Sequence, residues 1–159
     1  MRRRIRAVGS PGAARGKGAV EVLELKNVDP AACPVGVVLA AAGRAAVEYV
    51  FKSIDLAMAG EIAAAVTAPL NKEAMSRAGF PFDGHTEIYA QKTGTTDYSM
   101  LLLVGRLRVL HVSTHVSLRE AVERVTRERV LTVIRLAGIA AQMLGIRAPR
   151  IGVARQRLH

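Results

Sequence analysis

The stretch IAAAVTAPLNKEAMSRAG, residues 62–79, decides the fold class. It opens with a short apolar run, residues 62–66, which predicts a strand. A proline-containing turn follows, and Asn71 is placed to cap a short helix that Gly79 ends. A strand that leads through a turn into a helix is the building unit of α/β proteins.

The rest of the chain alternates in the same way. Strands are predicted over residues 20–25, 98–104, 108–113 and 150–154. Helices are predicted over 35–59, 117–125 and 126–144, and a short one follows the Gly-His-Thr triplet and stops at Gly94. This order favours a single α/β domain over residues 20–154 with a largely parallel sheet, and a basic tail or loop over residues 1–19. A chain of 159 residues is long enough for one such domain.

Composition narrows the classes of protein. No apolar run is long and uncharged enough to span a bilayer, and the Arg-rich start lacks the apolar stretch of a secretory signal. The single cysteine, Cys33, excludes a disulfide within the chain and is typical of a reducing compartment. We therefore expect a cytoplasmic protein without membrane contact.

The net charge of +10 raises the alternative of a nucleic-acid binder. Residues 1–20 contribute six basic side chains and residues 147–159 contribute four, so that residues 21–146 carry no net charge. The excess thus belongs to two tails, and aromatic side chains that could stack on bases are scarce. Nucleic acid is therefore not an expected partner.

Three segments follow predicted strands, where α/β proteins collect their ligands. In TAPLNK, Lys72 could face an anionic substrate or could simply be solvated. In GHTE, His85 and Thr86 could hydrogen-bond substrate oxygens, or Thr86 could cap the helix with His85 on the surface. In STHVSLRE, His115 falls just past the predicted strand, where a metal ligand or a base would belong, whereas His111 falls inside it.

The segments VTAPLNKEAMSRAGFPFDGHTEIYAQKTGT and LRVLHVSTHVSLREAVERVTRERVLTVIRLA resemble the 4-hydroxythreonine-4-phosphate dehydrogenase family of vitamin B6 biosynthesis. The resemblance runs from about Val20 to Ala154. It implies a homodimer that oxidises a phosphorylated hydroxy acid, foremost 4-hydroxythreonine 4-phosphate, with NAD or NADP and a divalent metal (Zn, Mg or Co). It also implies part of a fold like that of the isocitrate and isopropylmalate dehydrogenases.

Carried over residue by residue, the resemblance makes His85 and Thr86 substrate-binding residues and His115 a metal ligand. Lys72 becomes a further residue on the substrate side. The metal would polarise the hydroxyl group that is oxidised. The cofactor-binding residues are expected in a C-terminal part of the family that this sequence does not match.

The sequence also departs from the family at both ends. Its start is Arg-rich where the family has a Gly- and Pro-rich segment, and after RIGVA it reads RQRLH, an unmatched tail over residues 155–159. There the family continues with a second metal histidine, whose context His159 does not match. We therefore expect a shortened chain that is inactive alone. The alternatives are a paralogue acting on 4-phospho-D-threonate or 4-phospho-D-erythronate, and a non-catalytic dimerising remnant.

Overall fold

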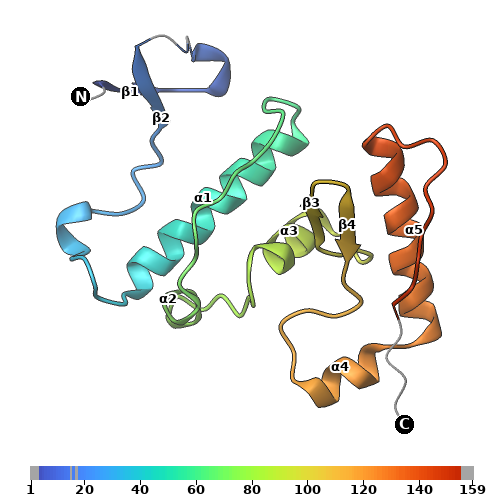
Figure 1. The fold of residues 1–159 in the computed structure, drawn as a ribbon. Helices are drawn as coiled ribbons and strands as arrows, with labels where there is room; N and C mark the ends of the chain where they lie inside the picture. Colours follow the sequence, from blue (N-terminus) through green and yellow to red (C-terminus); the bar gives the residue numbers. More distant parts are fainter. Residues whose placement is uncertain (1–3, 15, 17, 155–159) are drawn as a thin grey trace. The chain divides into compact units, whose positions relative to one another are not determined.

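The computed structural model describes residues 4–14, 16 and 18–154. Contacts within the chain gather into two compact units, residues 1–94 and 95–159, where the sequence predicts a single domain over residues 20–154. The elements are named in Figure 1, and each unit is described by itself.

The first unit opens with a parallel pair of strands. β1 (Arg4–Val8) pairs with β2 (Ala19–Leu23), in a register that sets Arg6 beside Glu21, and these two side chains form an ion pair. A short 3-10 helix, η1 (Pro11–Ala13), lies in the connection. The strand predicted over residues 20–25 is thus confirmed in its main part, and residues 4–8 form a strand where the sequence predicts a tail or loop.

A second short 3-10 helix, η2 (Pro30–Ala32), precedes α1 (Ala40–Met58), the longest helix of the unit. The helix predicted over residues 35–59 is confirmed in its main part, but its predicted start is wrong. Residues 35–39 are not helical, and Gly36 has a φ of 84°, which a right-handed helix does not contain.

α2 (Lys72–Arg77) begins and ends as predicted. The Asn71 side chain accepts a hydrogen bond from the Ala74 N–H at 2.8 Å, and Gly79 adopts a left-handed φ of 84° after the helix. The Phe80 N–H then donates back to the Met75 carbonyl at 3.0 Å, which completes a Schellman ending. α3 (His85–Thr93) follows, and Gly94 ends it in the left-handed region with a φ of 66°.

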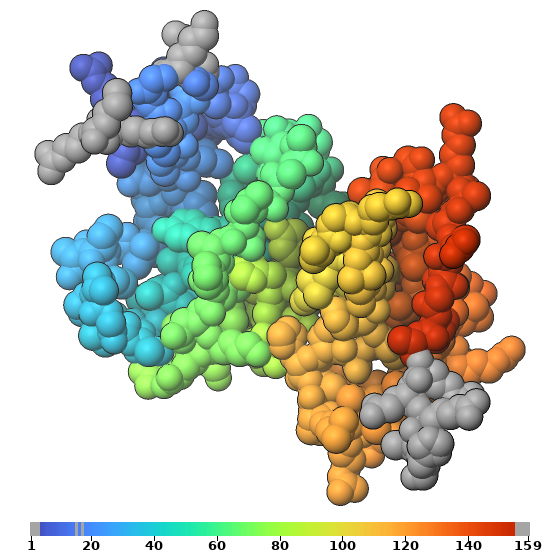
Figure 2. All heavy atoms as spheres, in the orientation of Figure 1, coloured from blue at the N-terminus to red at the C-terminus, as the bar shows by residue number. Residues whose placement is uncertain are grey.

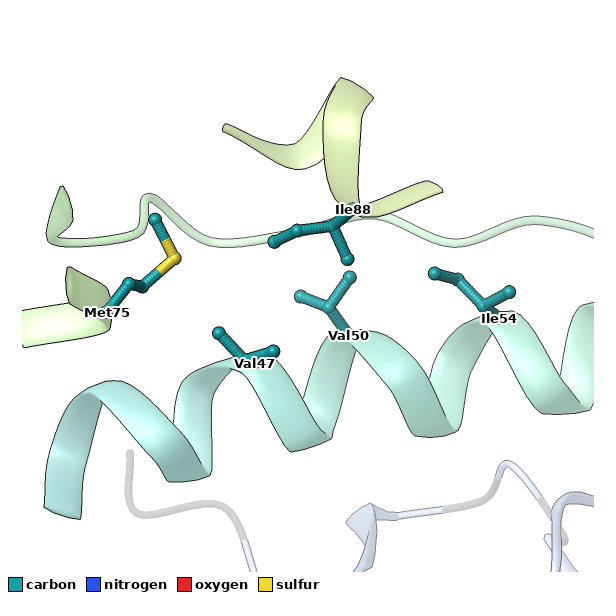
Figure 3. Packing of buried hydrophobic residues seen from close by; sticks show 5 residues of the cluster. All are labelled: Val47, Val50, Ile54, Met75 and Ile88. Atoms are coloured by element: carbon teal, nitrogen blue, oxygen red, sulfur yellow. The ribbon is translucent and has the colours of Figure 1, made fainter. Parts of the chain in front are cut away.

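The core of the first unit lies where α2 and α3 cover one face of α1. Val47, Val50 and Ile54 point from α1 toward Met75 of α2 and Ile88 of α3, as Figure 3 shows. All five side chains are buried. Three phenylalanines, Phe51, Phe80 and Phe82, pack against this core with ring centroids 6.1–6.4 Å apart. The loops before α2 and α3 thus lead into helices that are packed against this core.

The second unit combines a hairpin with two helices. β3 (Leu101–Val104) pairs antiparallel with β4 (Leu107–Leu110), and α4 (Leu118–Arg124) and α5 (Arg127–Met143) follow. Ser117 caps α4 and Thr126 caps α5, so both helices begin where the sequence predicts. After α5, residues 146–154 return beside the helix (Figures 1 and 2) and line a cavity of about 790 Å³ together with α5 and the hairpin.

The α/β class is confirmed, but the largely parallel sheet is wrong for the part of the chain that the structure describes. The described part of the chain contains one parallel and one antiparallel pair of strands. The segments 62–66 and 150–154, predicted as strands, form no ladder. A strand depends on a hydrogen-bonded neighbour, which a local sequence pattern cannot guarantee. Across the same described residues, no helix has the length and apolar character needed to cross a membrane.

Candidate substrate- and metal-binding residues

The start of α3 lacks the side-chain cap that the neighbouring helices have. Asn71, Ser117 and Thr126 each accept a hydrogen bond at the start of α2, α4 and α5, but no side chain does so at α3, whose N-cap is Gly84. The alternative that Thr86 caps this helix is therefore wrong, because Thr86 is its second residue. The first N–H groups of α3 have no acceptor within the helix and are free to face a ligand.

Two buried polar atoms at this helix start have no hydrogen-bond partner among the described residues. They are Nε2 of His85 and Oε2 of Glu87, the first and third residues of α3. Buried polar atoms normally have a partner, so a pair of such atoms within one turn indicates a place for a ligand or water. The sequence predicts His85 as a site residue but not Glu87. The signal for Glu87 in the sequence is its position directly after the Gly-His-Thr triplet.

The backbone of Gly84 is open to the outside. A Cβ atom built on this residue would meet only Oε2 of Glu87, at 3.6 Å, which is an ordinary contact distance. The φ of 174° is extended and open to any residue. The fold itself thus gives no steric reason for glycine here, and space remains for a ligand to approach the backbone.

Lys72 is the first residue of α2, directly after the capping Asn71, and its side chain is exposed. Among the described residues its ammonium group forms no hydrogen bond or ion pair. α2 and α3 are both held by α1, through Met75 and Ile88 respectively. Lys72, His85 and Thr86 therefore belong to one rigidly packed unit, with a free cation at one helix start and free N–H groups at another.

His115 belongs to the second unit and lies between β4 and α4. Its side chain is exposed, and its φ of 56° is unusual for a residue other than glycine. Such backbone conformations gather at functional sites, where the surrounding structure maintains them. Its predicted position past the end of the strand is confirmed.

His111 differs from its prediction. β4 ends at Leu110, so His111 lies outside the strand. Nδ1 of its ring is buried and has no partner among the described residues. Three residues separate His111 from His115, and this spacing is the signal in the sequence that links the two histidines.

The described residues do not make a complete metal site. No group of three or more His, Cys, Asp or Glu side chains in this part of the chain is arranged to hold a metal ion. A catalytic divalent metal needs about three protein ligands and an open position. His115 by itself can supply one nitrogen ligand to a metal, but the described residues do not supply the other ligands that a catalytic site needs. His159 lies outside the described residues.

Comparison with known proteins identifies the relatives of this arrangement. Residues 3–155 match the family profile described as pyridoxal phosphate biosynthetic protein PdxA. The chain belongs to the PdxA family. The match includes most of the Arg-rich start, which the resemblance from about Val20 onward leaves out.

Individual relatives of the PdxA family carry two names. The chain is 44% identical over 137 residues to D-threonate 4-phosphate dehydrogenase of Pectobacterium atrosepticum, covering 86% of this chain and 42% of the relative. It is 40% identical over 151 residues to the enzyme of that name from Cupriavidus necator, covering 94% of this chain and 45% of the relative.

Among solved structures, the chain is similar to 4-hydroxythreonine-4-phosphate dehydrogenase of Klebsiella pneumoniae. The TM-score is 0.86 at 37% identity, with 94% of this chain and 46% of that chain covered. The protein of the same name from Burkholderia phymatum gives a TM-score of 0.78 at 35% identity, with 92% of this chain and 44% of that chain covered. The chain spans less than half the length of each of these four relatives.

Proposed function

We propose that the chain carries the substrate-binding part of a dehydrogenase that oxidises a phosphorylated hydroxy acid. We propose D-threonate 4-phosphate as the favoured substrate. Membership of the PdxA family supports the reaction class. The names of the relatives from Pectobacterium and Cupriavidus support this substrate over 4-hydroxythreonine 4-phosphate. Both compounds carry the phosphate. 4-Hydroxythreonine 4-phosphate has an ammonium group where D-threonate 4-phosphate has a hydroxyl group.

The observation that carries the proposal is the uncapped start of α3. A helix N-terminus with free N–H groups attracts phosphate and carboxylate groups, and partly buried donors there add hydrogen bonds. His85 offers a buried ring nitrogen without a partner, and Thr86 offers a hydroxyl group in the same turn. Lys72 supplies a cation that neutralises part of the substrate charge. Each of these groups acts by binding and orienting the substrate.

The cofactor and metal are proposed from the family resemblance. NAD or NADP, when bound, accepts the hydride that leaves the carbon of the oxidised hydroxyl group. His115 is proposed as one ligand of a divalent metal. Because the described residues contain no complete ligand set, we assign no step of the reaction to the metal within this chain. A homodimer and an isocitrate-dehydrogenase-like fold for the whole enzyme are proposed on the same basis.

Substrate binding by the 159-residue chain tests the proposal. D-threonate 4-phosphate, titrated into isotopically labelled protein, is expected to shift the amide NMR signals of residues 84–87 at the start of α3. Inorganic phosphate is expected to shift the same signals at higher concentration, since it lacks the carboxylate and hydroxyl groups. 4-Hydroxythreonine 4-phosphate is expected to bind more weakly than D-threonate 4-phosphate.

Matched variants separate a specific site from general attraction of anions. Thr86→Val keeps the side-chain shape but removes the hydroxyl group, and it is expected to weaken binding about fivefold to tenfold, as the loss of one hydrogen bond would. Lys72→Ala is expected to weaken binding, whereas Lys52→Ala, which removes an exposed cation from α1, is not. Equal losses from the two lysine variants, or no response at residues 84–87, would contradict the proposed site.

One structural feature favours a second candidate, a non-catalytic binding module. The described residues offer no complete metal-ligand group, which limits the chemistry that they can perform alone. Such a module would still bind the phosphorylated acid at α3. Binding without turnover by the chain alone would therefore fit both candidates, and turnover after addition of the part of a relative that this chain does not cover would favour the enzyme.

A further inference from the structure

An arginine of α5 hydrogen-bonds to the backbone that leads to His115. Arg129, in the first turn of α5, donates from Nε to the Val112 carbonyl at 2.9 Å. A second guanidinium nitrogen donates to the Tyr98 carbonyl, also at 2.9 Å. Tyr98 lies just before β3 and Val112 just after β4, so this one side chain joins the two ends of the hairpin.

A second contact holds the neighbouring residue. The Ser99 hydroxyl group donates to the His111 carbonyl at 2.8 Å. Two consecutive carbonyls, those of His111 and Val112, are thus fixed just before the residue with the unusual backbone angle, His115. A positive φ is uncommon for a residue other than glycine, although histidine adopts it more often than most, and the two contacts fix the chain directly before this position.

Helix stability gives no reason for an arginine at this place. A positive charge in the first turn opposes the helix dipole, which favours acidic side chains there. Among the described residues the Arg129 guanidinium has no carboxylate partner. Its planar group instead directs two N–H donors at two carbonyls, a geometry that the ammonium group of lysine cannot reproduce.

We infer that Arg129 is a positioning residue for His115. It fixes the end of the hairpin, together with Ser99, so that the segment 112–115 presents the histidine in one conformation. The functional meaning of this role rests on the proposed function, in which His115 is a metal ligand. The structural role of Arg129 can be tested without metal or substrate.

The test compares Arg129→Lys with the native chain by ¹⁵N relaxation. In the native chain the order parameters of residues 112–115 are expected to be near those of rigid backbone, about 0.85. In Arg129→Lys they are expected to fall toward about 0.6 or lower, whereas those of residues 133–141 in α5 stay unchanged. Ser99→Ala, a milder change, is expected to lower the same values by less.

Two control variants distinguish positioning from general loss of structure. Thr126→Ala removes the cap of α5 and is expected to lower the thermal midpoint without mobilising residues 112–115. Arg135→Lys changes an exposed arginine on the same helix and is expected to do neither. Unchanged order parameters in Arg129→Lys, or an equal fall in α5 and in 112–115, would overturn the inference. Failure of substrate binding at α3 would leave this result unaffected, so the two failures are distinguishable.

Discussion

At the scale of single residues, Gly43 sets how closely α1 and α2 can pack. A Cβ atom built on Gly43 would lie 2.1 Å from the carbonyl oxygen of Ala74, a backbone atom that cannot turn away. Gly43→Ala is therefore expected to force the two helices apart and to destabilise the fold by about 1–3 kcal/mol, the usual cost of overpacking. In a chain of this size that lowers the thermal midpoint by several degrees, which calorimetry can measure.

Gly138 provides the matched control. It lies within α5, and a Cβ atom there would meet nothing within 4 Å. Gly138→Ala is expected to stabilise the protein by about 0.5–1 kcal/mol, because alanine favours the helix and restricts the unfolded chain. A loss of stability in Gly138→Ala similar to that in Gly43→Ala would show that close packing is not what makes Gly43 necessary.

Single residues also show how far the sequence predicts the site. Asn71 and Thr126 are predictable caps, because their side chains accept hydrogen bonds from backbone groups three residues away. The sequence does not mark Glu87 or His111 as site residues, because what distinguishes each of them is a buried atom without a partner among the described residues, and burial depends on distant residues. The substrate and metal roles of Lys72, His85, Thr86 and His115 rest on the family resemblance and stay predictions.

At the scale of elements, α4 carries a charge-dependent start. The Ser117 N–H and the Ser117 hydroxyl group both donate to Oε2 of Glu120, at 3.1 and 2.9 Å, and the Glu120 N–H donates back to Ser117 Oγ at 3.3 Å. These bonds, the backbone one foremost, lower the pKa of Glu120 below its usual value of 4.5, and the charge of Arg124 adds to the effect. The capping box therefore depends on the ionised carboxylate.

The sign of this pH dependence follows from the lowered pKa. The folded state prefers the ionised form, so the stabilisation of α4 is complete above the usual pKa of glutamate and is lost as the pH falls through the lowered value. Ser117→Ala removes the hydroxyl donor but keeps the backbone N–H, and it is therefore expected to raise the pKa of Glu120, followed by NMR of its carboxyl carbon, part of the way toward the usual value. An unchanged titration midpoint in Ser117→Ala would contradict the contribution of the Ser117 hydroxyl group.

Elements also show where prediction from sequence reaches its limit. The helices α2, α4 and α5 were predicted with nearly correct bounds, because capping residues and apolar spacing are local signals. The segments 62–66 and 150–154 have the composition of strands but lack a ladder. The sequence pattern places the start of α1 too early. Val35, Val37 and Val38 continue the apolar pattern, but the positive φ of Gly36 does not fit a right-handed helix.

At the scale of the whole molecule, exposed apolar side chains predict self-association. Leu118 and Val122 lie four residues apart on one face of α4, and Val125 follows directly after the helix; their exposed fractions are 82%, 59% and 59%. We expect light scattering at micromolar concentration to find a dimer or a larger species. Val122→Lys is expected to shift this equilibrium toward monomer, whereas Glu123→Gln on the same helix is not. A monomeric native chain would contradict the prediction.

The most direct measurement of the central claim is NADH production by this chain with D-threonate 4-phosphate, NAD and Co²⁺. Under the proposed function, α3 binds the substrate and His115 is one metal ligand, and the described residues contain no complete ligand set. We therefore expect no NADH from the chain alone. Adding the C-terminal part of the Pectobacterium relative is predicted to give NADH production, which His115→Ala abolishes. NADH production by the chain alone, lost in His115→Ala, would contradict the account, because the ligands would then come from within these 159 residues.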